Sequence, residues 1–302
     1  MPGKKQTKLR IKRGRKHAGR LALLASLLFA LSAAPASASG TVRVLYAGSL
    51  VALMEHSLRP AFDHASGDRF EGYPGGSTLL ANEIKARLRP ADVFVSAVPE
   101  VNRTLEGKAN GDWVAWYLAF ARSPLVIGYN PKSRFAADFK TKPWYEVLEE
   151  PGFRLGRTDP KLDPKGTLTV RLMKKAEAFY KIPGLAKRVL GGPENPAQVL
   201  PEETLVGRLQ SGELDAGFFY STETAEAHIP AIALPASIAS AALYTATVLK
   251  RAPNPKGAVR FVAFLLTPEA RRLMKEKGLS VEKPALSGRA PAAIRALLEP
   301  AP

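Results

Sequence analysis

The stretch FRLGRTDPKLDPKGTLTVRLMKKAEAFY, residues 153–180, shows the building unit of this chain. It begins with the short apolar run Phe153–Gly156, which predicts a strand. Residues 158–166 follow with two prolines and two aspartates, a composition typical of a turn. Thr167–Tyr180 then predicts a helix, because its apolar residues return at helical spacing: Leu168, Leu172, Met173, Ala176 and Phe179. A strand, a short connection and an amphipathic helix in succession are typical of an α/β protein.

The same alternation continues on both sides of this stretch and predicts an α/β fold with mostly parallel sheets. Further strands are predicted over Val42–Tyr46, Asp92–Ala97, Leu125–Tyr129, Ala216–Tyr220, Ala231–Leu234 and Leu243–Leu249. Further helices are predicted over Ser77–Arg89, with Leu80, Ile84 and Leu88 on one face, over Glu202–Gln210, and from Pro268 to Gly278.

The N-terminal segment predicts export from the cytoplasm. Nine of the 44 basic residues lie within positions 4–20, an apolar run covers 21–33, and Ala36-Ser37-Ala38 follows. This three-part pattern is typical of a secretory signal peptide, here residues 1–38. The apolar run is shorter than the ~20 residues that span a bilayer. We therefore expect a periplasmic protein that is released from its signal peptide.

Composition and charge exclude several classes of protein. The 302 residues correspond to about two domains. The chain contains no cysteine, which excludes disulfide scaffolds and thiol nucleophiles. The formal charge of +17 falls to +8 once the signal peptide is left out, and the remaining basic residues are spread along the chain. A nucleic-acid-binding protein would cluster them among aromatic residues, so we expect no nucleic-acid partner.

The chain also shows no recognisable catalytic arrangement. Ser49 lies in the sequence AGSLV, which is not the G-x-S-x-G nucleophile elbow. The four histidines show neither metal-ligand spacing nor the spacing of a catalytic triad. We therefore expect that the protein is not an enzyme and uses no cofactor.

Polar residues and glycines gather where the predicted strands end and helices begin. These junctions are Gly48-Ser49, Gly75-Gly76-Ser77, residues 158–166 and Tyr220–Glu223. Ligands of open α/β sheets bind outside the carboxyl ends of strands, where helix N-termini present free N–H groups. Together the junctions predict a nest of neutral donors for a small dianion, which would need no lysine or arginine.

Five motifs resemble one known family. YAGSL, GGST, ADVFVSA, TDPKLDPKG and GELDAGFFYST are similar to the periplasmic molybdate/tungstate-binding proteins of ABC importers, and the resemblance covers nearly all of residues 41–280. It implies the type II periplasmic-binding-protein fold, in which two α/β lobes joined by two crossing strands hold an oxyanion in their cleft. The crossing strands would be those near Leu125–Tyr129 and Leu243–Leu249. The implied lobes are 39–120 plus 240–302 for lobe one and 121–239 for lobe two.

The resemblance also implies roles for individual residues. Ser49 and Ser77 match the two serines that hydrogen-bond the oxyanion from lobe one. Tyr220 matches a tyrosine whose hydroxyl donates to the anion. Asp163 matches an aspartate that reaches the metal centre of the oxyanion, and Asp159 is the weaker candidate. The remaining implied contributions are close backbone approach or further donors from Gly48, Gly76 and Thr78, and a backbone N–H from the helix start at Glu202-Glu203.

One departure from the family leaves the coordination open. In the branch that binds with carboxylates, a glutamate follows the tyrosine by about five positions, where this chain has Ala225. Glu223 instead resembles an acidic residue that need not touch the anion, although with Asp163 it could bond the metal centre. Both tetrahedral binding by donors and six-coordinate binding through carboxylates therefore stay open. Neither mode involves a free metal cation.

Several alternatives to molybdate or tungstate remain on the same fold. The motifs do not separate these oxyanions from sulfate, thiosulfate or another small anion such as an organic acid. A sensory adaptor built on this scaffold is a further alternative. A ferric-iron binder would need adjacent tyrosines in the cleft, and in the sequence Tyr220 stands alone. As partners we expect the small oxyanion and an ABC permease in the inner membrane, and we expect the protein to be a monomer.

Overall fold

The computed structural model describes residue 3 and residues 40–298 of the chain, so the predicted signal peptide, 1–38, lies outside the described residues except for Gly3. The strands are β1 (Thr41–Ala47), β2 (Arg69–Gly75), β3 (Val93–Ser96), β4 (Trp116–Tyr129), β5 (Leu155–Gly156), β6 (Ala216–Tyr220), β7 (Ala231–Ile232), β8 (Ala241–Val248) and β9 (Ser280–Gly288). The α-helices are α1 (Val51–Leu53), α2 (Arg59–Ser66), α3 (Ser77–Ala86), α4 (Pro99–Arg103), α5 (Trp144–Val147), α6 (Pro164–Tyr180), α7 (Leu185–Leu190), α8 (Leu205–Gln210), α9 (Ser221–Glu226), α10 (Pro255–Phe264), α11 (Pro268–Glu276) and α12 (Ala292–Ala296). Short helical turns are η1 (Gly48–Leu50), η2 (Met54–Leu58, a π-helical turn), η3 (Lys108–Asn110), η4 (Asp138–Lys140) and η5 (Glu202–Thr204).

The sheet is mixed, with the strand order β2-β1-β3-β8-β4-β6-β5 and with β7 and β9 also paired to β4. Strand β1 runs parallel to β2 and β3, and β5 runs parallel to β6. Every pairing that involves β4 or β8 is antiparallel. The prediction of mostly parallel sheets is therefore wrong. The reason is that β4 and β8 run antiparallel to their neighbours and do not continue the strand–helix–strand pattern of parallel sheets.

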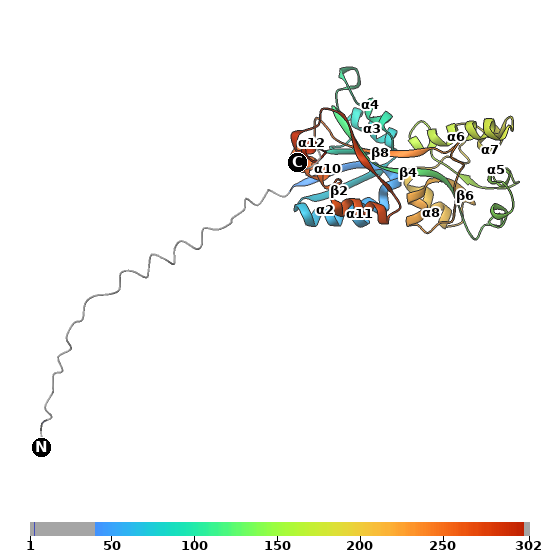
Figure 1. Cartoon of the computed structure of the whole chain (residues 1–302), viewed down its shortest axis with the longest axis horizontal. Helices are drawn as coiled ribbons and strands as arrows, with labels where there is room; N and C mark the ends of the chain where they lie inside the picture. The colour runs from blue at the N-terminus through green and yellow to red at the C-terminus, as the bar shows by residue number, and fades with distance from the viewer. Residues whose placement is uncertain (1–2, 4–39, 299–302) are drawn as a thin grey trace. The chain divides into compact units, whose positions relative to one another are not determined.

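Strand β4 links two groups of elements. Its first part, Trp116–Pro124, pairs with β8 and β9, whereas Leu125–Tyr129 pairs with β6. Figure 1 shows α2, α3, α4, α10, α11 and α12 around β1 and β2, and α5, α6, α7 and α8 around β6. We call the first group, with β1–β3, the β1 side, and the second group, with β5–β7 and α9, the β6 side.

The buried face of each predicted helix agrees with its apolar spacing, with two exceptions. In α6, Leu172, Met173 and Ala176 are fully buried, but Phe179 is 49% exposed because it turns away in the last helical turn. Leu88 was expected on the buried face of α3 but is 68% exposed. Helix α3 stops at Ala86, because Arg87 adopts a left-handed backbone conformation (φ 55°) and ends it.

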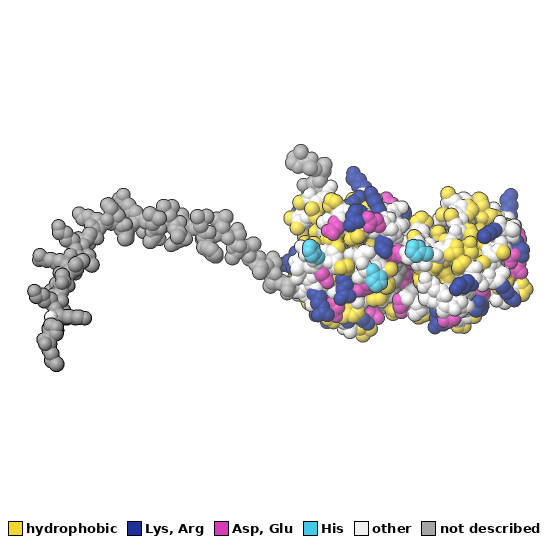
Figure 2. Space-filling view, turned by 90° about the horizontal axis from the view of Figure 1, so that it is seen from below, with side chains coloured by type: hydrophobic (Ala, Val, Ile, Leu, Met, Phe, Trp, Pro, Cys, Tyr) yellow, Lys and Arg dark blue, Asp and Glu magenta, His cyan; other side chains and the backbone are white. Residues whose placement is uncertain are grey.

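The surface of the described residues carries mixed charge. Figure 2 shows basic and acidic side chains interspersed on one face of the molecule, without a continuous basic stripe on that face. Within residues 40–298, none of the helices has the length and apolar character needed to cross a membrane.

Candidate functional site

One serine and two tyrosines lie close together where β1 and β6 end. Ser49 lies in η1, directly after β1, and its Oγ is 2.9 Å from the hydroxyl of Tyr244 on β8. The rings of Tyr244 and Tyr220 lie with centroids 6.1 Å apart, and Tyr220 is the last residue of β6. The Tyr220 hydroxyl is buried and has no hydrogen-bond partner among the described residues. This hydroxyl cluster therefore contains one donor that is available to a ligand.

A lysine surrounded by carboxyl groups lies next to the hydroxyl cluster. Lys165, in the first turn of α6, is fully buried. Its ammonium donates to both carboxylate oxygens of Glu223, at 2.8 and 2.9 Å, and lies 3.0 Å from Oε2 of Glu202. Glu223 also accepts from the backbone N–H of Tyr220 at 2.7 Å. The ion cluster of Lys165, Glu202, Glu223 and Asp163 thus joins the starts of α6, η5 and α9.

Asp163 fixes the start of α6. It is the N-cap residue, and its Oδ1 accepts from the backbone N–H of Lys165 at 2.8 Å and from the Thr158 hydroxyl at 2.9 Å. Its side chain is buried, whereas Asp159 accepts from the backbone N–H of Lys161 at the surface. Of the two aspartates, Asp163 is therefore the one that belongs to the buried cluster, and Asp159 is a turn residue.

Burial dominates the acid–base properties of the cluster. Desolvation raises the pKa of the carboxyl groups of Asp163, Glu202 and Glu223, and it does so most strongly for Glu202. Burial lowers the pKa of the Lys165 ammonium, but the attraction of the three carboxylates outweighs it and raises this pKa overall. The ammonium therefore stays charged while the carboxyl groups become easier to protonate.

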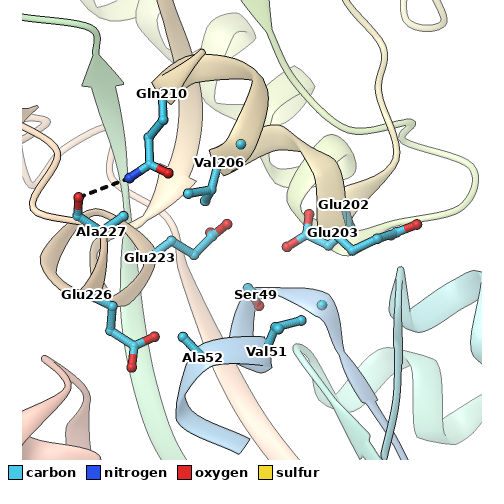
Figure 3. A pocket seen from close by; sticks show the side chains of 12 residues that line it. Ser49, Val51, Ala52, Glu202, Glu203, Val206, Gln210, Glu223, Glu226 and Ala227 are labelled. Carbon is cyan, nitrogen blue, oxygen red and sulfur yellow. Dashed lines mark hydrogen bonds between the residues drawn. The ribbon is translucent and has the colours of Figure 1, made fainter. Parts of the chain in front are cut away.

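A cavity of about 350 Å³ opens beside the two clusters, between η1 and α1 on the β1 side and η5, α8 and α9 on the β6 side. Figure 3 shows Glu223 pointing into it between Val206 and Ser49, while Glu202 and Glu203 extend in different directions from one turn. Glu226 also lines the cavity, and desolvation raises its pKa to about 7 although Lys277 lies 3.7 Å away. The walls of the cavity are therefore acidic.

We expect Glu226→Gln to flatten the pH dependence of folding stability. Because the pKa of this carboxyl is higher in the folded protein than in the unfolded chain, its stabilising effect is complete below about pH 4.5. That effect is lost as the pH rises through about 7. The loss for a shift of this size is on the order of 2–3 kcal/mol.

Urea unfolding at pH 5 and pH 8 measures this effect. Glu226→Gln should gain stability relative to the parent at pH 8 but not at pH 5. Glu203→Gln supplies the control, because it makes the same substitution at an exposed position that lines the same cavity. If the free energy of unfolding depends on pH in the same way for the parent and for Glu226→Gln, then Glu226 has the same pKa in the folded and the unfolded chain.

Two glycines bring the β1 side and the β6 side into direct contact. A Cβ on Gly48 would lie 2.5 Å from the Cγ of Glu202, and a Cβ on Gly76 would lie 2.6 Å from the carbonyl oxygen of Leu162. The backbone N–H of Leu79 also donates to that carbonyl at 2.9 Å. Only a residue without a side chain fits these contacts, which explains both glycines physically.

Two other residues expected at the site have different surroundings. Ser77 is buried, and its hydroxyl oxygen accepts from the backbone N–H of Ala97 at 3.1 Å. Thr78 lines another cavity, of about 480 Å³, together with Leu168 and Arg171. The structure therefore brings Gly48, Ser49 and Glu223 to one cavity and places Thr78 in a second one.

Sequence reasoning missed two residues of the site. It expected neutral donors without a lysine, but Lys165 is at the centre of the ion cluster. A lysine in the first turn of a helix opposes the helix dipole, and this signal could have indicated an anionic partner. It also took Tyr220 to stand alone, which is wrong, because Tyr244 lies beside it. Tyr244 sits within an ordinary buried strand, and no local signal marks it. Within residues 40–298, no group of three or more histidine or acidic side chains has the arrangement of a metal site.

The sequence of this chain matches one protein family and is similar to several known proteins. Residues 42–280 match the model of a family described as bacterial extracellular solute-binding protein. The molybdate/tungstate-binding protein WtpA of Thermococcus kodakarensis is 25% identical over 283 residues, which cover 76% of this chain and 78% of that protein. A putative ABC transporter molybdenum-binding protein of Haloferax volcanii is 32% identical over 199 residues, 66% of this chain and 61% of that protein.

Solved structures give the same picture of the fold. The periplasmic molybdate-binding protein of Azotobacter vinelandii matches with a TM-score of 0.63 and 19% identity, over 80% of this chain and 99% of that chain. This likeness confirms the periplasmic-binding-protein fold that the sequence predicts.

Proposed function

We propose that this chain, which belongs to the family of bacterial extracellular solute-binding proteins, captures molybdate or tungstate outside the cytoplasm. It would then deliver the oxyanion to an ABC importer. The names of the two relatives support this class of ligand. The structural observation that carries the proposal is the buried, unpartnered hydroxyl of Tyr220 beside the bonded pair Ser49 and Tyr244. A buried hydroxyl without a partner costs free energy, and an oxyanion oxygen would accept its hydrogen bond.

The contacts of the carboxyl groups favour tetrahedral binding by donors. Both oxygens of Glu223 already accept from Lys165, and Oδ1 of Asp163 accepts from the first turn of α6. An ionised carboxylate repels a dianion unless it is protonated or bonds the metal centre. We therefore propose that hydroxyl and backbone N–H groups hold the oxyanion, with Ser49, Tyr220 and Ser77 as side-chain donors. Asp163 and Glu223 would position the helix starts instead of bonding the metal.

We further propose that the oxyanion is enclosed between two lobes. Lobe one would comprise residues 39–120 and 240–302, and lobe two residues 121–239. Strand β4 would cross from lobe one to lobe two, and β8 would begin directly after the chain returns to lobe one. The close approaches of Gly48 to Glu202 and of Gly76 to Leu162 would join the two lobes. Such an arrangement can satisfy an anion completely only when both lobes meet around it.

We also propose where the protein acts and with which partner. Cleavage of the predicted signal peptide near residue 38 would release the chain into the periplasm. There it would act as a monomer that meets the permease of the importer. Its role would be binding and delivery, without chemical change of the oxyanion.

A second candidate function is binding of a hard trivalent cation such as ferric iron. One observation favours it: the rings of Tyr220 and Tyr244 lie with their centroids 6.1 Å apart, so the fold brings two tyrosines together. Phenolate and carboxylate oxygens are ligands for hard cations. The buried ammonium of Lys165 counts against a cation at this position.

Thermal unfolding with a panel of ions tests the proposed function. Molybdate or tungstate at 100 times its dissociation constant should add ~2.7 kcal/mol of stability, which raises the melting temperature by about 5–10 °C. Tyr220→Phe should weaken oxyanion binding by at least tenfold, because it removes a hydrogen bond to a charged group. Tyr145→Phe, on the same side but against Tyr180, is the matched control.

Other outcomes of this panel would redirect the assignment. A rise in melting temperature with sulfate alone would replace the ligand while keeping the binding function. A rise with ferric iron, together with a visible phenolate-to-iron absorption band that Tyr220→Phe abolishes, would establish the second candidate.

A further inference from the structure

A third cavity, of about 280 Å³, lies at the opposite end of β3 from the hydroxyl cluster. Ala91, just before β3, and Leu249, just after β8, form part of its wall. Three arginines, Arg87, Arg89 and Arg251, also line it. The carboxyl end of the parallel strand β1, which carries Ser49, faces the other way, so this cavity is separate from the site proposed for the oxyanion.

Two of the three arginines lie over one tryptophan, and the third, Arg89, lies over Tyr73. The guanidinium groups of Arg251 and Arg87 lie 4.2 and 5.7 Å from the ring centroid of Trp113, which is 8% exposed. Arg89 lies 3.1 Å from Glu83, whereas neither Arg87 nor Arg251 has a carboxylate partner within residues 40–298. The indole attracts both guanidinium groups, and Arg251 also donates to the backbone carbonyl of Gly111 at 2.9 Å. Neither contact supplies a carboxylate to offset the positive charge.

An exposed leucine stands between two of these arginines. Leu88 is 68% exposed and follows Arg87, whose left-handed backbone conformation ends α3. At such a helix end, the residue after the left-handed one commonly packs back against the helix. Here its backbone N–H makes the expected bond to the carbonyl of Glu83, at 3.1 Å, while the side chain stays in solvent.

We propose that this patch, defined as Arg87, Leu88, Arg89, Trp113 and Arg251, docks the protein onto an anionic phospholipid surface. The guanidinium groups would bind lipid phosphates, and Leu88 would enter the boundary between headgroups and acyl chains. Arginine, tryptophan and an exposed aliphatic residue are the combination that suits such an interface. A free phosphate ion would use the arginines but would leave Leu88 without a role. The proposal does not depend on the identity of the captured ion.

Co-sedimentation with vesicles tests the proposal. The protein is purified after export by a bacterial host, so that processing of the N-terminal segment has already taken place. It should bind vesicles of phosphatidylcholine with phosphatidylglycerol, and not vesicles of phosphatidylcholine alone. Each arginine should contribute about fivefold in affinity, so Arg87→Gln with Arg251→Gln should weaken binding about twenty-fivefold. Leu88→Ser, which changes no charge, should weaken it as well.

A matched variant separates this patch from general attraction by the net positive charge. Lys174→Gln with Lys175→Gln removes two exposed charges from α6, on the β6 side, and should leave vesicle binding within about twofold of the parent. The proposal would be overturned if both double variants weakened vesicle binding equally. It would also be overturned if the parent protein did not bind anionic vesicles. Calorimetric binding of inorganic phosphate at Arg87 and Arg251, with no effect of Leu88→Ser on vesicles, would assign the cavity to a free anion instead and would also overturn docking.

Discussion

Lys165→Met should destabilise the protein by about 3–5 kcal/mol at pH 7.5, because it leaves the buried carboxylates of Glu202 and Glu223 without their counter-charge. Methionine has a similar length, so the loss reflects charge more than packing. For a chain of this size the melting temperature should fall by about 10 °C or more. The deficit should shrink as the pH falls, because burial raises the pKa of both carboxyl groups and a protonated carboxyl group no longer needs the ammonium.

A nearby lysine offers the control for this experiment. Lys161 lies four residues earlier, in the loop that leads into α6, and pairs with Glu194 at the surface. Such a surface pair contributes at most about 1 kcal/mol. Lys161→Met should therefore be nearly neutral. Adding Glu202→Gln and Glu223→Gln to Lys165→Met should recover part of the lost stability. If Lys165→Met proves as stable as Lys161→Met, the cluster contributes no net electrostatic stability.

Gly76→Ala should weaken oxyanion binding by at least thirtyfold, about 2 kcal/mol or more. The added methyl would lie 2.6 Å from the carbonyl oxygen of Leu162, and a backbone atom cannot rotate away as a side-chain end can. The same clash would stretch the hydrogen bond from Leu79 to this carbonyl. Calorimetric titration with molybdate measures the affinity, and small-angle scattering should show less compaction of the variant on binding.

Two further glycines calibrate this prediction. Gly48→Ala meets the Cγ of Glu202 at 2.5 Å, but this side chain has rotatable bonds, so its effect should be smaller. Gly207→Ala, which lines the same cavity, would meet nothing within 4 Å and should bind like the parent. An affinity of Gly76→Ala equal to that of Gly207→Ala would mean that the contact between Gly76 and Leu162 is not needed for binding.

The part of the fold that the sequence predicts best is the part with local signals. The strand Ala216–Tyr220 has the predicted bounds, and α6 starts three residues earlier than predicted, at the proline after its N-cap Asp163. Strands β2 and β9 were missed, because both contain a proline and neither shows a clear alternation of apolar residues. The first part of β4 was also missed, since an unbroken apolar run carries no period that distinguishes a strand from a buried helix.

In the site as well, residues with a local sequence signal could be predicted, whereas contacts between residues far apart in the sequence could not. Ser49 and Tyr220 could be selected because each ends a strand at the edge where ligands bind. The pairing of Ser49 with Tyr244 joins residues from opposite ends of the chain, and no local pattern reports it. The same holds for Lys165, whose partners Glu202 and Glu223 follow on two later elements. Sequence reasoning therefore selected residues that the structure places near one another, but it did not anticipate the buried charges around them.

The position of β8 between β3 and β4 has a consequence for the order in which the protein folds. Val93 pairs with Val248, and Trp116 pairs with Gly288, so early strands depend on partners that are synthesised last. Pairings between residues so far apart in the sequence slow folding, because the entropy of closing a long loop is lost before the strand contacts form. The first three strands therefore keep an open edge until almost the whole chain has emerged. Such a delay would leave the chain unfolded for the export that its N-terminal segment predicts.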